Sequence, residues 1–193
     1  TGIRKIISCH IRDFLPFPLK QLFPFVRKGM HLKTPSAQDV FEFMDLIKKY
    51  EPISNPPKLA WENPAALLYT GGTTGVSKGV ALTQANLSSN VQQINAWFPN
   101  FISGAEIVVG CLPFFHSFGM TCAMNVAIYN GYADVLVPKP EPQTILDAID
   151  KYKATFIPAV PTLYNGMINF PELKKYSLKT IKGCFSGGAP MPM

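Results

Sequence analysis

The chain has 193 residues, of which 47% are hydrophobic and 16% are charged. This length fits one domain or slightly more, and the apolar content is enough for a buried core, so a largely disordered chain is excluded. The net charge of +6 is uneven, because seven Lys and Arg residues and only one acid lie in residues 1–33, while the rest of the chain is neutral. The basic balance therefore belongs to the N-terminal segment and does not indicate a body that binds nucleic acid.

The four cysteines are far apart in the sequence and lack the spacing of metal ligands. They are Cys9, Cys111, Cys122 and Cys184. There is no window of about 18 apolar residues and no signal-peptide pattern, so no membrane-spanning helix is predicted. We therefore expect a cytoplasmic protein with four reduced thiols, three of them in the core.

The first 60 residues are expected to form a variable segment, 1–60, that ends in a proline-rich linker. Residues 3–7 are a short predicted strand, and apolar residues at a 3.6-residue period predict a helix over 38–50 with Ser36 as its N-cap. The linker is the stretch 51–64, which contains four prolines.

Strands and helices alternate in residues 61–193, the second predicted domain. The predicted strands are 65–69, 80–82, 106–112, 133–137, 155–157 and 181–185. The predicted helices are one that begins after Thr83, its expected N-cap, and those at 118–129, 144–152 and 161–168. Parallel strands are joined through helices of about this length, so the expected fold class is α/β, a mostly parallel sheet with flanking helices on both faces. The chain begins at Thr1 without an initiator Met and stops at Met193 in a predicted loop, so we expect a piece of a longer protein.

A run rich in glycine and threonine between the first two of these strands is the strongest motif. It consists of Tyr69, Thr70, Gly71, Gly72, Thr73, Thr74, Gly75, Val76, Ser77, Lys78, Gly79 and Val80. Closely spaced glycines allow a tight turn in which successive backbone N–H groups converge on an anion. The hydroxyls and the lysine add donors for phosphate oxygens and a ligand for Mg²⁺. On residue types alone, an ordinary hairpin turn is the alternative.

Two better-known phosphate-binding patterns do not fit this run. A Walker loop needs lysine after its last glycine, whereas here Lys78 precedes Gly79. The dinucleotide fingerprint needs glycine where this chain has Thr70.

Two further blocks follow predicted strands. The first, Leu-Pro-Phe-Phe-His-Ser-Phe-Gly, contains His116; a lone histidine at a strand end is more often structural than a ligand. The second is Ser186-Gly187-Gly188-Ala189-Pro190, in which bare backbone at the carboxyl end of a strand would let a flat ligand lie close, although a plain strand-to-helix turn is the alternative. A serine-hydrolase elbow is excluded, because one residue too many separates Gly183 from Ser186.

Together the three blocks resemble the signatures of adenylate-forming enzymes, the superfamily of acyl-CoA synthetases, luciferases and peptide-synthetase adenylation domains. The Gly71-Gly72 pair is most similar to bacterial long-chain fatty-acid–CoA ligases. The resemblance is tight after the linker and loose before it. It implies a fragment of the large N-terminal domain of such an enzyme. The later Mg²⁺-binding and ribose-binding segments and the C-terminal domain with its catalytic lysine are missing, so the chain alone is expected to be inactive.

The resemblance also implies a reaction and roles for particular residues. A fatty acid, ATP and coenzyme A would be the substrates, with Mg²⁺ as the metal and most of the coenzyme A site outside this chain. Lys78 and His116 would be catalytic, and Thr70 would contact Mg²⁺. The nucleotide would bind residues 69–80 together with Gly187, Gly188, Ala189 and Pro190. Substrate contacts would come from His116, Gly119 and Met120, the last in place of a tryptophan that gates the tunnel in some long-chain members.

Several alternatives remain open at this level. The parent could adenylate another carboxylate, or the chain could be a non-catalytic module that binds a nucleotide or acyl group. The basic and aromatic stretch 4–33 could be a solvated loop packed by its phenylalanines, or it could lie on an anionic membrane at the inner face, where each base near the surface contributes about 1 kcal/mol. No nucleic-acid partner is expected, and the oligomeric state is not predicted.

Overall fold

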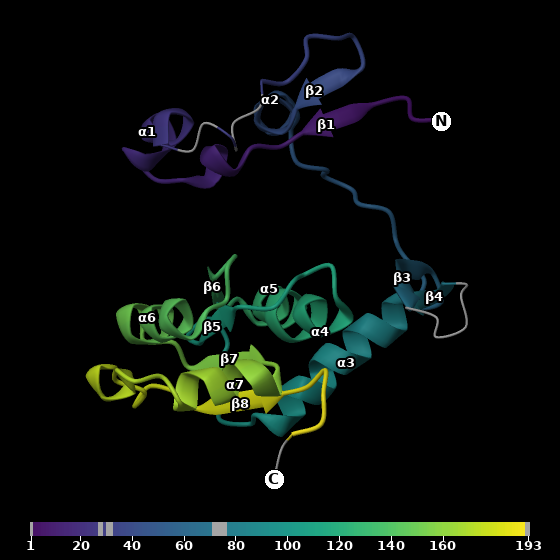
Figure 1. Ribbon diagram of the computed structural model, residues 1–193. Coiled ribbons are helices and arrows are strands. Elements are labelled where there is room, and N and C mark those ends of the chain that lie inside the picture. The colour runs from purple at the N-terminus through teal and green to yellow at the C-terminus, as the bar shows by residue number, and fades with distance from the viewer. Residues whose placement is uncertain (1, 27–28, 30–32, 71–76, 192–193) are drawn as a thin grey trace. The chain divides into compact units, whose positions relative to one another are not determined.

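The computed structural model describes residues 2–26, 29, 33–70 and 77–191 and divides the chain into two compact units, Thr1–Lys58 and Leu59–Met193 (Figure 1). Within these described ranges, no helix combines the length and the apolar character that crossing a membrane requires.

The first unit contains a two-stranded parallel sheet. Its elements are β1 (Ile6–Ser8), η1 (Ile11–Phe14), α1 (Leu19–Val26), β2 (Val40–Glu42) and α2 (Phe43–Lys49). The helix predicted over 38–50 is therefore wrong in its first part, and its N-cap is Glu42 rather than Ser36. Val40 and Phe41 favour extended backbone, and pairing with β1 satisfies their backbone groups, which outweighs the helical period.

The second unit begins with an antiparallel hairpin of β3 (Pro64–Thr70) and β4 (Lys78–Thr83), which runs directly into α3 (Gln84–Trp97). Thr83 is the N-cap, as predicted. Its hydroxyl accepts a hydrogen bond from the Asn86 N–H at 3.2 Å, and the Asn86 side-chain oxygen accepts one from the Thr83 N–H at 3.0 Å. This reciprocal capping box fixes the direction in which α3 leaves the hairpin.

A four-stranded parallel sheet follows, in the order β6-β5-β7-β8. The strands are β5 (Ile107–Gly110), β6 (Ala133–Leu136), β7 (Phe156–Ala159) and β8 (Gly183–Ser186). From β5 the chain crosses to β6 on one side and then returns to β7 on the other side of β5. The point at which the strand order reverses therefore lies between β5 and β7, where open α/β sheets bind their ligands.

Helices cover both faces of this sheet, which confirms the predicted α/β fold class (Figure 1). The remaining elements are α4 (Ser117–Gly119), the π-helix η3 (Met120–Asn125), α5 (Val126–Asn130), α6 (Pro142–Tyr152), α7 (Pro161–Ile168) and η4 (Leu173–Lys175). On one face Val108 and Phe156 pack with residues of η3 and α5, and α3 packs over the same helices. On the other face Val109 and Ile157 pack against α6 and α7.

The four cysteines are free thiols, as predicted, but the expectation that three lie in the core is wrong. Cys111 and Cys122 are buried, and burial raises the pKa of each to about 12. Cys184 is exposed because β8 is the last strand of the described sheet. Cys9 is exposed in the first unit.

Candidate functional site

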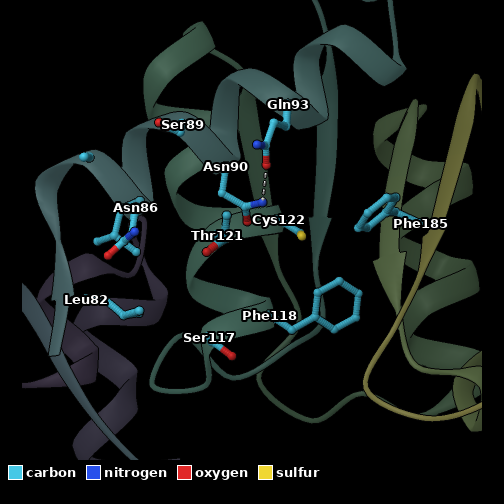
Figure 2. A pocket seen from close by; sticks show the side chains of 12 residues that line it. Leu82, Asn86, Ser89, Asn90, Gln93, Ser117, Phe118, Thr121, Cys122 and Phe185 are labelled. Atoms are coloured by element: carbon cyan, nitrogen blue, oxygen red, sulfur yellow. Dashed lines mark hydrogen bonds between the residues drawn. The ribbon is translucent and has the colours of Figure 1, made fainter. Parts of the chain in front are cut away.

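The second and third sequence blocks meet at one edge of the sheet, because the carboxyl ends of parallel strands point the same way. The rings of Phe118, in the block after β5, and Phe185, at the end of β8, lie 6.1 Å apart between centroids (Figure 2). A Cβ on Gly187 would lie 3.1 Å from the Phe118 ring. The glycine at this position therefore lets the third block pass directly against the second.

His116 is the N-cap of α4 and has an exposed side chain. Its Nδ1 accepts a hydrogen bond from the backbone N–H of Phe118 at 3.2 Å. In the neutral ring the proton is then carried on Nε2, which assigns this second nitrogen as a donor. The local fold thus holds the imidazole in one orientation and leaves Nε2–H available to an acceptor such as a carboxylate.

Gly119 and Met120, the other predicted substrate contacts, follow in the next turn. Gly119 is buried, and a Cβ there would lie 2.3 Å from the carbonyl oxygen of Pro113, so this glycine allows the helix to sit on the preceding loop. Met120 is half-buried at the start of η3. The structure therefore gives Gly119 a packing role next to the site.

A cavity of about 590 Å³ opens beside the His116 block, between the first turns of α3 and the α4–η3 segment (Figure 2). This volume lies within the range of small-molecule sites. It is lined by Leu82, Ala85, Asn86, Leu87, Ser89, Asn90, Gln93, Ser117, Phe118, Thr121, Cys122 and Phe185. None of these lining residues is charged. The cavity therefore suits a neutral group with apolar surface, whereas phosphates need the cationic side chain of the hairpin.

The hairpin β3–β4 places two of the predicted phosphate ligands opposite each other. Thr70 pairs with Lys78, and the Thr70 hydroxyl donates to the Lys78 carbonyl at 3.4 Å. Both side chains are exposed, as are those of Tyr69, Ser77 and Val80. Tyr69 pairs with Gly79, where a Cβ would lie 3.4 Å from the tyrosine ring. The rest of the predicted loop, Gly71, Gly72, Thr73, Thr74, Gly75 and Val76, lies outside the described residues.

The third block presents backbone to solvent at the end of β8. Gly188 has φ +80°, a left-handed conformation that favours glycine. Gly187 is half-buried, and its N–H reaches the Ala159 carbonyl at 3.4 Å. Gly188, Ala189 and Pro190 are exposed. This geometry leaves a stretch of exposed backbone after β8, and its contact with a flat ligand stays a prediction.

Sequence reasoning missed two walls of the cavity. The polar residues Asn86, Ser89, Asn90 and Gln93 form a stripe on α3 at helical spacing, and the pattern was readable in the sequence. The π-helix η3, which turns Thr121 and Cys122 toward the cavity, carries no sequence signal that separates it from the continuous helix predicted over 118–129. Such π-turns are frequent at functional sites.

A parallel α/β sheet with the second and third blocks at its carboxyl edge is the fold of the large domain of adenylate-forming enzymes. The family of AMP-binding enzymes matches residues 13–193, and the chain belongs to this family.

Individual members of the family and a solved structure are also similar to this chain. The long-chain-fatty-acid–CoA ligase of Bacillus subtilis (strain 168) is 39% identical over 194 residues, which cover 99% of this chain and 35% of that protein. A 4-coumarate–CoA ligase of Humulus lupulus is 33% identical over 159 residues, covering 81% and 29%. The crystal structure of ATP-bound MatB from Rhodopseudomonas palustris shares the fold, with a TM-score of 0.70 at 23% identity over 97% of this chain and 36% of that one. The chain thus spans about a third of the length of these proteins.

Proposed function

We propose that this chain is the nucleotide- and acyl-binding part of a long-chain fatty-acid–CoA ligase. The observation that carries the proposal is the 39% identity to such a ligase across 99% of the chain. In the reaction, a fatty-acid carboxylate oxygen attacks the α-phosphorus of ATP, and the bond to pyrophosphate breaks. The thiol of coenzyme A then attacks the acyl carbonyl carbon, and AMP leaves with the bonding electrons.

Lys78 is the proposed electrostatic catalyst of the first step. It stands exposed at the start of β4, next to Thr70 on the paired strand. A lysine here would stabilise negative charge on the β- and γ-phosphates as pyrophosphate departs. No residue that lines the cavity beside α3 is charged, so we assign the stabilisation of phosphate charge to the hairpin.

Mg²⁺ and its proposed ligand Thr70 fit this arrangement. The Thr70 hydroxyl is an exposed oxygen, and Mg²⁺ prefers oxygen ligands, keeping several waters and binding mainly through substrate phosphates. Among the described residues, no group of three or more His, Cys, Asp or Glu could hold a metal ion. When bound with ATP, the ion would supply further neutralisation of phosphate charge.

His116 and the cavity are the proposed acyl site. The Nε2–H of His116 would donate to the carboxylate or the acyl-adenylate, while Nδ1 continues to accept the hydrogen bond from the Phe118 N–H. The chain beyond the carboxylate would enter the cavity between α3 and η3, past the rings of Phe118 and Phe185. Coenzyme A binding and the second half of the reaction would depend largely on the two thirds of the parent protein that this chain does not span.

The direct test uses the full-length parent, purified and assayed for palmitate-dependent exchange of pyrophosphate into ATP and for palmitoyl-CoA formation. Lys78→Ala should lower the exchange rate about 10- to 1,000-fold, the size of one electrostatic contact. Lys174→Ala removes an exposed lysine on η4 and is the matched control, with no expected change. An unchanged rate for Lys78→Ala would remove the proposed role of this lysine.

A second carboxylate class is supported by the similarity to a 4-coumarate–CoA ligase. The same exchange assay with 4-coumarate and with fatty acids of increasing chain length separates the two classes. A higher kcat/KM for 4-coumarate than for palmitate would replace the fatty-acid proposal. ATP binding without exchange for any carboxylate would instead indicate a non-catalytic module.

We also propose that the parent is a cytoplasmic protein whose first unit binds anionic lipid. Its proposed fatty-acid substrate dissolves in membranes, so contact with a membrane would bring the enzyme to its substrate. The apolar residues Phe17, Leu22 and Phe25, on or beside α1, are exposed, and Lys20 lies on the same helix. Such a surface suits the headgroup zone of an anionic bilayer. Co-sedimentation should be stronger with vesicles that contain phosphatidylserine than with neutral vesicles, and equal binding to both would refute the contact.

A further inference from the structure

Strand β7 has a proline in the interior of the sheet. Pro158 has no N–H to donate, although β7 lies between β5 and β8. The pairing of β7 with β5 consists of one pair, Val108 opposite Phe156, whereas its pairing with β8 continues to Ala159 opposite Ser186. The carboxyl end of β7 is therefore held to β8 and much less to β5, at the point where the strand order reverses.

Two side chains approach the backbone carbonyls near Pro158. The hydroxyl of Tyr164, on α7, donates to the carbonyl of Ile157 at 2.5 Å and lies 3.5 Å from the carbonyl of Phe185. One side chain thus spans from β7 to β8 next to Pro158. The Cys111 thiol approaches the Pro158 carbonyl at 3.4 Å from the β5 side. Tyr164 is half-buried, so its hydroxyl is partly shielded from competing water.

The end of β8 leads directly into the candidate site. Phe185 lines the cavity, and Gly187, two residues later, lies against the ring of Phe118. The Gly187 N–H reaches back to Ala159 at the end of β7. A shift of β8 against β7 would therefore move one wall of the cavity and the bare backbone of the third block together.

We propose that Tyr164 is a positioning residue that fixes the end of β8, and with it Phe185 and Gly187, for binding of the nucleotide and acyl group. The inference rests on the proposed ligase function. Tyr164 acts through β7 and β8 and does not itself touch the reacting atoms. Its hydroxyl adds a side-chain hydrogen bond to the backbone pairing of β7 with β8, next to Pro158 and on the strand that is only weakly paired with β5.

The test compares Tyr164→Phe with a matched control, Tyr176→Phe, in the full-length parent. The hydroxyl of Tyr176 also makes one side-chain hydrogen bond, to Asp147 on α6 at 3.0 Å. Each change removes one oxygen atom. Tyr164→Phe should raise KM for ATP or fatty acid about two- to tenfold, the fold-change expected for one hydrogen bond. Tyr176→Phe should leave both KM values unchanged.

Hydrogen exchange of the 193-residue chain gives a second readout that needs no turnover. The peptide covering residues 183–190 should exchange faster in Tyr164→Phe than in the wild type and should be unchanged in Tyr176→Phe. Equal KM values and equal exchange in the two variants would overturn the positioning role. If the wild-type parent shows no ligase activity, the proposed function fails, and the exchange comparison still decides whether Tyr164 holds β8.

Discussion

Asp134, on β6, should make the stability of the chain depend on pH in a direction opposite to that of most carboxylates. Its side chain is half-buried, and one carboxylate oxygen, Oδ1, is buried without a hydrogen-bond partner in the described structure. A Cβ on Gly110 would lie 2.5 Å from this oxygen, so the glycine is what makes room for it. Burial raises the pKa of Asp134 from 3.8 to about 6, although a hydrogen bond with the Gly110 backbone partly opposes the shift.

The raised pKa of Asp134 determines both the sign and the size of its contribution to the pH dependence of stability. The folded state binds the proton more tightly than the unfolded state, so this stabilisation is complete below pH 3.8 and is lost as pH rises through about 6. A shift from 3.8 to about 6 corresponds to at most about 3 kcal/mol. Since the side chain is only partly buried, solvent screening reduces this to about 1–3 kcal/mol.

The variant Asp134→Asn removes the ionisation and nearly keeps the shape. Urea denaturation of the wild-type chain and the variant, followed by circular dichroism at pH 4, 6 and 8, gives the difference in free energy of unfolding at each pH. The variant should be more stable by about 1–3 kcal/mol at pH 8 and nearly equal at pH 4. Other titrating groups are common to both proteins and cancel. A difference that stays constant from pH 4 to pH 8 would refute the reasoning.

Three further changes have expected outcomes. Lys182→Met should lower the free energy of unfolding by about 3 kcal/mol in urea denaturation, because Glu106 is fully buried and would lose its ion-pair partner at 2.6 Å; a loss below 0.5 kcal/mol would show that the pair contributes little. Thr83→Ala should cost about 1 kcal/mol by the same method through loss of the α3 cap, and Thr83→Ser should restore most of it. His116→Ala in the parent should lower the rate of adenylate formation about 10- to 1,000-fold with only a small fall in melting temperature, since the side chain is exposed and its one structural contact is the cap of the short helix α4. Equal loss of rate and of stability would indicate a structural histidine.

The elements that local signals specify were predictable from the sequence. The helix predicted over 161–168 is α7 with the same bounds, because Pro161 stands at its first position, where its missing N–H costs nothing. The cap at Thr83 follows from its hydroxyl and the asparagine three residues later. By contrast, β2 depends on a partner strand more than thirty residues away, which a window of helical periodicity does not include.

The candidate site also contains some features that the local sequence predicts and others that depend on the tertiary fold. Backbone-permissive glycines and the lone histidine could be found in the sequence because their chemistry lies within short blocks. That Phe118 and Phe185 face each other could not, since it follows from the strand order β6-β5-β7-β8, which local pattern does not determine. The chain passes from β5 to β6 on one side and then to β7 on the other side of β5. The loops after β5 and β8 therefore lie at the same edge of the sheet. Between these strands lies β7, whose Pro158 has no N–H and whose pairing with β5 consists of one residue pair. The hydroxyl of Tyr164, from the opposite face of the sheet, adds a hydrogen bond beside the backbone pairing of β7 with β8, so we expect the rigidity of the site to depend in part on packing on that face.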